Sequence, residues 1–161
     1  MFNLSKKNLL IAVCLISFIA LISAYFIEYI LGHQPCNLCV YERIPYFLAM
    51  LIVLINYKYN KLEKYLILLL AIIFLIATIL SLYHLGIEQG FIQESLLCDV
   101  EKGANIVDKD EILKQLQQKS ISCKDVTFKI FGLSLTNYNI IISLLLTIGL
   151  TKIYFGYEKN R

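Results

Sequence analysis

The chain alternates long apolar runs with short polar segments, a pattern that predicts membrane-spanning helices. The first run covers residues 8–30 and carries a single charge, Glu28. At about 1.5 Å per residue, roughly 20 apolar residues cross the ~30 Å hydrocarbon core of a bilayer. A cleaved signal peptide has an apolar region of only about 7–15 residues and a small-residue cleavage site, so we expect this helix to be retained.

Three further apolar runs follow, at residues 40–57, 65–85 and 134–154. The second run is too short to span a bilayer if it is counted from Pro45, so its helix is expected to begin near Val40. Pro45 then falls in or just beyond the first turn, where a missing N–H costs little. The sequence thus predicts an all-α membrane protein. Its single domain, residues 1–161, would be a four-transmembrane-helix bundle with connecting loops at about 31–40 and 86–133.

Composition agrees with a membrane protein and argues against nucleic-acid binding. Apolar residues make up 58% of the chain and charged residues 17%, against about 45–50% and about 25% in soluble domains. The net charge of +3 is mild, and no basic stripe runs along the sequence to follow a phosphate backbone. A lipid bilayer is therefore the expected surrounding, and no nucleic-acid partner is expected.

The distribution of basic residues predicts the orientation of the spans. The N-terminal tail, the break at 58–64 and the C-terminal tail together hold eight Lys and Arg residues in short segments. Such segments face the cytoplasm in most membrane proteins. Both termini are therefore expected in the cytoplasm, with the loops at 31–40 and 86–133 in the periplasm. This orientation describes a multi-pass protein of a bacterial inner membrane.

Four of the five cysteines fall in the two predicted periplasmic loops. Cys36 and Cys39 lie in the first loop, and Cys98 and Cys123 lie in the second, while Cys14 lies within the first span and is expected to be a packing residue. The periplasm is oxidising, and four cysteines can pair in three ways. Cys36 and Cys39 have the C-x-x-C spacing of redox enzymes, whose thiolates are readily stabilised.

Arg43 follows Cys39 by four residues and would lie on the same helix face, about one turn further along. An arginine at membrane depth costs on the order of 2.5–3.5 kcal/mol on insertion scales and usually faces a partner or a site. A Cys39 thiolate is one anion that it would stabilise, and the oxygen of a reduced quinone is another. Alternatively, Arg43 reaches the lipid headgroups or pairs with the neighbouring Glu42.

Metal and haem sites are disfavoured by the spacing of the candidate ligands. Zinc requires a second C-x-x-C or a cysteine and histidine set, but the second cysteine pair is widely separated. His33 and His84 lie at the ends of different spans. A c-type haem requires C-x-x-C-H, whereas Val40 follows Cys39. No metal is therefore expected.

These motifs resemble the DsbB family of quinone-linked, disulfide-forming membrane proteins. The segment C-N-L-C-V-Y-E-R at 36–43 is similar to the family signature C-x-x-C-x-x-x-R at the start of a second span. The segment Y-H-L-G-I-E-Q at 83–89 leads toward Cys98, and the segment 122–139 runs from the fourth outer cysteine into the last span. The resemblance covers nearly the whole chain.

The resemblance implies a role for each outer cysteine. Cys36 and Cys39 would form the quinone-facing pair, with Cys39 as the thiolate that contacts quinone and Arg43 supporting quinone binding. A reduced thioredoxin-fold oxidase of the DsbA type would attack Cys98 and form a mixed disulfide with it. Cys123 would then be released and pass the electrons to Cys36 by thiol–disulfide exchange. This step would require motion of the second loop.

Three ionisable residues near the span ends are given less specific roles. The resemblance implies that His84 and Glu88 border the quinone pocket or its proton path, although a histidine at a membrane interface is more often structural. Glu28 either accepts a proton or, as we favour, reaches the headgroup region.

The function that the resemblance implies is a protein thiol–quinone oxidoreductase. It would reoxidise a periplasmic dithiol oxidase and pass the electrons to ubiquinone or menaquinone. A membrane scaffold with two structural disulfides and no turnover is the alternative from another class. A reductase of the vitamin K epoxide reductase kind is disfavoured, because the C-x-x-C lies in the first outer loop rather than at the last span.

Overall fold

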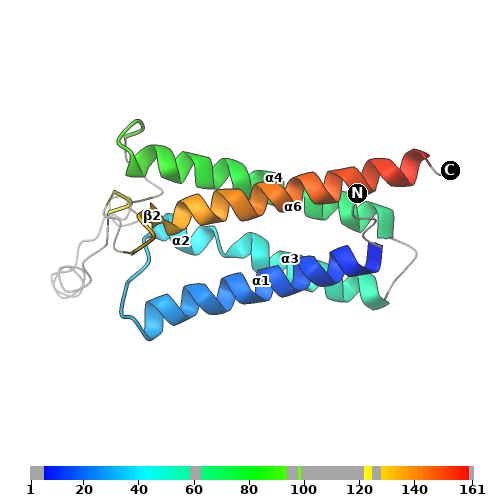
Figure 1. Ribbon diagram of the computed structural model, residues 1–161, viewed down its shortest axis with the longest axis horizontal. Helices are drawn as coiled ribbons and strands as arrows, with labels where there is room; N and C mark the ends of the chain where they lie inside the picture. Colours follow the sequence, from blue (N-terminus) through cyan, green and yellow to red (C-terminus); the bar gives the residue numbers. More distant parts are fainter. Residues whose placement is uncertain (1–5, 59–62, 94–97, 99–121, 125–127, 160–161) are drawn as a thin grey trace, which may run out of the picture.

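The protein, described by a computed structural model, is a bundle of long helices (Figure 1). The structure describes residues 6–58, 63–93, 98, 122–124 and 128–159. Within these residues, four helical stretches are long and apolar enough to cross a membrane. The prediction of an all-α protein with four spans is therefore confirmed, whereas the side of the membrane that each loop faces stays a prediction.

The bundle consists of four long helices with short elements at one end. The long helices are α1 (Lys6–Tyr29), α3 (Ile44–Lys58), α4 (Glu63–Glu88) and α6 (Leu135–Lys159). The short elements are α2 (Asn37–Tyr41), β1 (Lys129–Ile130) and β2 (Leu133–Ser134). Helix α4 packs along α6 and α1 packs along α3, whereas α1 and α6 touch only sparsely. Helix α1 begins and α6 ends at the same end of the bundle, opposite to α2 and the strands (Figure 1).

The second span begins slightly earlier than expected and is broken after its first turns. Its apolar stretch covers residues 37–56 and is divided into α2 and α3. Pro45 explains the break, because it has no N–H to donate to the Tyr41 carbonyl and its ring would clash with that group. The Arg43 N–H instead bonds to the Val40 carbonyl at 3.1 Å. The break leaves Arg43 at the junction of the two helices.

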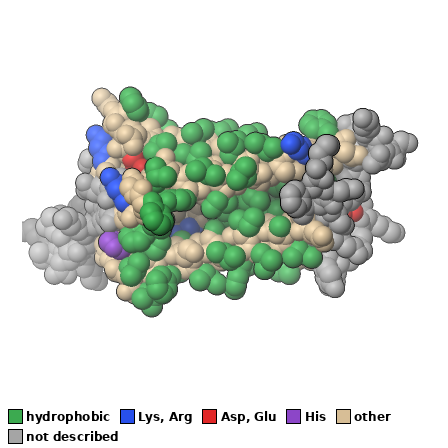
Figure 2. All heavy atoms as spheres, viewed as in Figure 1, with side chains coloured by type: hydrophobic (Ala, Val, Ile, Leu, Met, Phe, Trp, Pro, Cys, Tyr) green, Lys and Arg blue, Asp and Glu red, His purple; other side chains and the backbone are tan. Residues whose placement is uncertain are grey.

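Apolar side chains cover the outside of the bundle, as expected for a surface that faces lipid. The exposed large side chains include Phe18, Ile19, Leu54, Ile79 and Leu145. Figure 2 shows such side chains along the length of one face, with a hollow between the helices. Inside the bundle, the hydroxyls of Thr78 in α4 and Ser143 in α6 are hydrogen-bonded at 3.0 Å. Such polar contacts hold helices together in a membrane, where apolar burial gives little driving force.

A tight hairpin precedes α6, inside the segment 86–133 that was expected to be a loop. Ile130 pairs with Leu133, and the intervening Phe131 and Gly132 have φ values of 49° and 81°. Positive φ at both central positions is the geometry of a two-residue hairpin turn, and glycine adopts it without strain. Helix α4 also extends into the start of this segment. The hairpin thus brings the polar residues that open α6 against the end of α4.

Candidate functional site

The two cysteines of the C-x-x-C motif lie at the start of α2. Cys36 is the N-cap residue, and its sulfur accepts a hydrogen bond from the Cys39 backbone N–H at 3.3 Å. The two sulfur atoms are 2.8 Å apart. Cys36 is buried and Cys39 is half-buried. The short helix therefore holds both sulfurs together, with Cys36 on the inner side.

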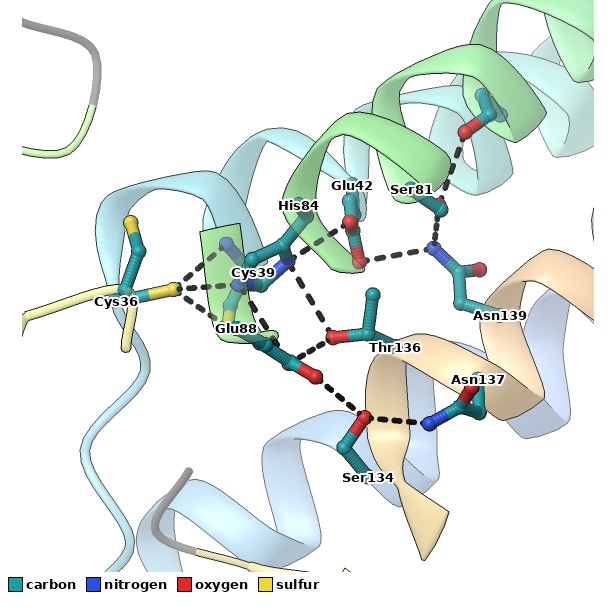
Figure 3. Close-up of polar contacts among 12 residues, drawn as sticks. Cys36, Cys39, Glu42, Ser81, His84, Glu88, Ser134, Thr136, Asn137 and Asn139 are labelled. Carbon is teal, nitrogen blue, oxygen red and sulfur yellow. Dashed lines mark hydrogen bonds and ion pairs between the residues drawn. The ribbon is translucent and has the colours of Figure 1, made fainter. Parts of the chain in front are cut away.

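His84 of α4 joins this pair, although it is distant in the sequence. Its Nε2 lies 3.5 Å from the Cys36 sulfur, and its Nδ1 lies 3.0 Å from a carboxylate oxygen of Glu42. The other oxygen of Glu42 accepts a hydrogen bond from the Asn139 amide at 2.9 Å. Figure 3 shows the ring between the sulfur and the carboxylate. Glu42 and Asn139 thus fix the orientation of the imidazole ring.

Glu88 lies one turn beyond His84 and completes a buried polar cluster between α4 and α6. Its Oε1 lies 3.8 Å from the Nε2 of His84. Thr136 donates a hydrogen bond to Oε1, and Ser134 donates one to Oε2 at 2.7 Å (Figure 3). Buried polar groups require such partners, because an unpaired one loses its hydration without compensation. Both carboxylates near His84 are therefore hydrogen-bonded from α6.

The surroundings of the inner pair lower the pKa of the Cys36 thiol. The hydrogen bond with the Cys39 thiol lowers the pKa of Cys36 from 9.0 to about 5, burial opposes this shift, and the nearby His84 lowers the pKa further. The role implied for Cys39 by the resemblance, as the thiolate that contacts quinone, stays a prediction. Cys36 caps α2 and accepts a hydrogen bond from the Cys39 backbone N–H, a contact that the C-x-x-C spacing alone does not reveal.

Arg43 is paired across the bundle with a residue of α1. Its guanidinium lies 2.5 Å from an oxygen of Glu28 and stacks over the Tyr25 ring, 4.9 Å from the ring centroid. The sequence suggested the headgroups or Glu42 as its alternatives, but Glu42 faces His84 instead. Glu28 was expected to reach the headgroup region and in fact holds Arg43. Glu28 and Arg43 are 15 residues apart in the chain, with α2 between them, which is why local spacing did not indicate the pair.

A cavity of about 570 Å³ connects these side chains. Its wall is mostly apolar and is formed largely by α1 and α6. Its polar lining includes all the cofactor-binding residues named from the sequence, which are Cys39, Arg43, His84 and Glu88. Ligand pockets of about 300–1,000 Å³ with apolar walls and a few convergent polar groups are typical of small-molecule sites. The cavity is large enough for a quinone ring.

Cys98 and Cys123 form a disulfide beside the C-x-x-C pair, with Cα atoms 5.9 Å apart. Both belong to one buried cluster with Cys36, and Cys123 also lines the cavity. The Asn37 side chain donates a hydrogen bond to the Cys98 carbonyl at 3.2 Å. All four outer cysteines thus lie in one cluster, and the motion of the second loop that exchange would require stays a prediction.

Sequence reasoning missed the polar residues that support His84. Glu42 was considered only as a neighbour of Arg43, and Ser134, Thr136 and Asn139 were not singled out. A signal was present, because these three polar residues open an otherwise apolar span. Polar side chains inside a membrane span usually face the bundle interior and mark a functional site.

A four-span helical bundle with a buried thiol pair and an adjacent disulfide defines an integral membrane protein built for thiol–disulfide chemistry. Residues 6–152 match the family model described as "Disulfide bond formation protein DsbB", so the chain belongs to the DsbB family. It is 37% identical to "Uncharacterized protein RP370" of Rickettsia prowazekii (strain Madrid E), over 96% of this chain and 91% of that protein. Family membership implies a disulfide-forming oxidoreductase, in a family that is generally quinone-linked.

Proposed function

We propose that the protein is a thiol–quinone oxidoreductase, which oxidises a thioredoxin-fold dithiol partner of the DsbA type and passes the electrons to membrane quinone. One observation carries the proposal. The cavity is lined by one cysteine from each pair, Cys39 and Cys123. Arg43 and His84 also line it. A lipid-soluble acceptor and a disulfide relay would therefore meet at one place.

The first exchange steps follow from the positions of the cysteines. A thiolate of the reduced partner attacks Cys98, forms a mixed disulfide with it and releases Cys123 as a thiolate. Cys123 lies in the same cluster as Cys36, so it attacks Cys36 of the Cys36–Cys39 disulfide and frees Cys39. The second partner thiol then attacks the mixed disulfide, and the partner leaves oxidised with Cys98 reduced.

The last exchange returns the outer disulfide and leaves the inner pair as a dithiol. Cys98 attacks Cys123, which restores the Cys98–Cys123 disulfide and releases Cys36. At this stage Cys98 and Cys123 are bonded to each other, as they are in the structure, and Cys36 and Cys39 are free thiols. A quinone supplies a two-electron, two-proton acceptor for this dithiol. Each cycle converts two partner thiols into one disulfide and one quinone into quinol.

The charged side chains at the cavity have separate roles. Arg43 presents a guanidinium at the cavity wall and binds an oxygen that gains negative charge, while Glu28 and the Tyr25 ring hold it in position. His84 lies beside the Cys36 sulfur and is oriented by Glu42. A histidine in this position passes protons between the thiol pair and the cavity.

Replacing Arg43 by alanine is expected to raise the KM for quinone by about 10–100-fold, with a smaller fall in kcat. Hydrogen bonds to charged groups contribute on the order of 1.5–3 kcal/mol, and a lost ground-state contact appears mainly in KM. Lys64→Ala is the matched control, because Lys64 also lies over a tyrosine ring, 5.3 Å from the centroid of Tyr154. Steady-state quinone reduction at limiting quinone is the measurement, and unchanged turnover in Arg43→Ala would remove Arg43 from the site.

Labelling from outside the cell is expected to modify the loop between α1 and α2. In a variant with all five cysteines replaced by serine, Gln34→Cys should react with a membrane-impermeant maleimide in intact cells. Glu63→Cys, at the start of α4, is the control and should react only after the cells are permeabilised. The opposite labelling pattern would place the thiol pairs in the cytoplasm and would exclude a periplasmic partner.

A further inference from the structure

We propose that the reduced Cys36–Cys39 pair and His84 form a binding site for zinc, which is lost when the pair is oxidised. One sulfur of each cysteine and a ring nitrogen of His84 all lie within 4.8 Å of one another. Two thiolates and an imidazole are a set of three protein ligands that zinc accepts, with a fourth position open to another donor. The sequence did not predict a metal, because it could not show that His84 reaches the cysteines.

The spacing of the ligand atoms is close to that of a tetrahedral zinc site. Zn–S bonds of about 2.3 Å and Zn–N bonds of about 2.0–2.1 Å place a sulfur and a nitrogen roughly 3.5 Å apart. The Cys36 sulfur and the His84 Nε2 are 3.5 Å apart. The two sulfurs are 2.8 Å apart and would have to separate by about 1 Å around the ion. Cys39 is half-buried at the cavity, so its side chain has room to rotate.

The second nitrogen of His84 is already held as in a zinc site. Nδ1 lies 3.0 Å from the Glu42 carboxylate, which in turn accepts a hydrogen bond from Asn139. Ligating histidines usually make this contact through the nitrogen that does not bind the metal, and it fixes the ring and raises its basicity. The arrangement leaves Nε2, the atom nearest to the Cys36 sulfur, directed at the proposed ion.

The surroundings provide charge balance and a route for the ion. Zinc with two thiolates is neutral overall, so the bound state leaves no net charge at this buried position. The cavity reaches all three ligands. Glu88 supplies a second carboxylate close to the His84 ring, with Oε1 3.8 Å from Nε2. The fourth position therefore opens toward the cavity and Glu88, where water or this carboxylate can complete the tetrahedron.

Binding would compete with turnover, and this consequence rests on the proposed function. Zinc ligates both sulfurs as thiolates and displaces the proton of any thiol that is still protonated. Ligated sulfurs are not free to form the Cys36–Cys39 disulfide, so zinc would hold the enzyme in the dithiol state until the ion leaves. Zinc in the outer compartment would thus act as a reversible inhibitor of the reduced enzyme.

Direct zinc titration tests the site without quinone or a partner. Cys14→Ala, Cys98→Ala and Cys123→Ala together leave only the inner pair, and this parent protein is reduced with a phosphine and titrated against a chromophoric zinc chelator in detergent. We expect one zinc per reduced chain and none after the pair is oxidised to the disulfide. His84→Ala should weaken binding at least about tenfold, and Glu42→Gln about 10–100-fold if the outer contact orients the ring.

His33→Ala is the matched control, because His33 is the only other histidine of the chain and packs against Phe128 instead, with ring centroids 5.1 Å apart. Its zinc affinity should equal that of the parent. In the wild-type chain, zinc should also slow alkylation of Cys39, and a chelator should restore the rate. No zinc uptake by the reduced parent, or equal affinity in His84→Ala, would overturn the proposal. Quinone turnover measured with chelator present tests the proposed function separately.

Discussion

Replacing Cys39 by serine is expected to lower quinone reduction by at least about a thousandfold, as removal of a reacting group does in other enzymes. A serine hydroxyl cannot form a disulfide, so the inner pair could no longer give up two electrons. Cys39 lines the cavity, and its sulfur lies 2.8 Å from the sulfur of Cys36. Anaerobic loss of quinone absorbance with a reduced thioredoxin-fold partner is the measurement.

Cys14→Ser is the control for this variant. Cys14 is also unpaired and half-buried, but it lies within α1 and does not line the cavity. Its turnover should match that of the wild type. Retained quinone reduction in Cys39→Ser, with normal helical content, would contradict the assignment of the inner pair as electron donor.

Replacing Cys98 by serine is expected to abolish oxidation of the protein partner while leaving quinone reduction by a small dithiol. The outer disulfide would be absent, so the partner could not form its mixed disulfide and its oxidation should fall by at least about a thousandfold. The inner pair needs only Cys36 and Cys39, and dithiothreitol can reduce it directly. Parallel assays with the protein partner and with dithiothreitol provide the comparison.

The same pair of assays discriminates the enzyme from a structural scaffold. A scaffold would show no quinone turnover with either reductant in the wild type, and the Cys98→Ser change would appear only as lost stability. Cys123→Ser provides a second variant, because it removes the other cysteine of the same disulfide. If both variants still oxidised the protein partner at the wild-type rate, the proposed relay through the outer disulfide would be wrong.

The four helices could be predicted from the sequence because each membrane span depends only on the residues within it. Apolar runs of sufficient length require satisfied backbone hydrogen bonds in lipid, and a helix provides them without help from distant residues. The break between α2 and α3 also has a local cause, since Pro45 cannot donate to the Tyr41 carbonyl. The sequence placed Pro45 in the first turn of one helix, but it did not indicate that a separate short helix would precede the proline.

The contacts that shape the site were beyond local reasoning. His84 meets Cys36 across 48 positions, and Asn139 meets Glu42 across 97. Such contacts depend on which faces of the helices turn inward, and four apolar spans with weak amphipathic patterns do not determine this. The motif identified the reacting sulfurs and Arg43, because their spacing is short. It did not identify the residues that hold His84 and Arg43 in place.

The sparse contact between α1 and α6 affects the route by which a ligand enters the cavity. These two helices supply much of the cavity wall, and Figure 2 shows a hollow between helices on a face rich in apolar side chains, so we expect an entrance from the side that faces lipid. A hydrophobic molecule would enter from among the lipid tails without crossing water. The concentration that governs occupancy is then the mole fraction of ligand in the lipid or detergent phase. Affinities measured for this protein should therefore scale with the amount of lipid or detergent in the sample, at constant aqueous volume.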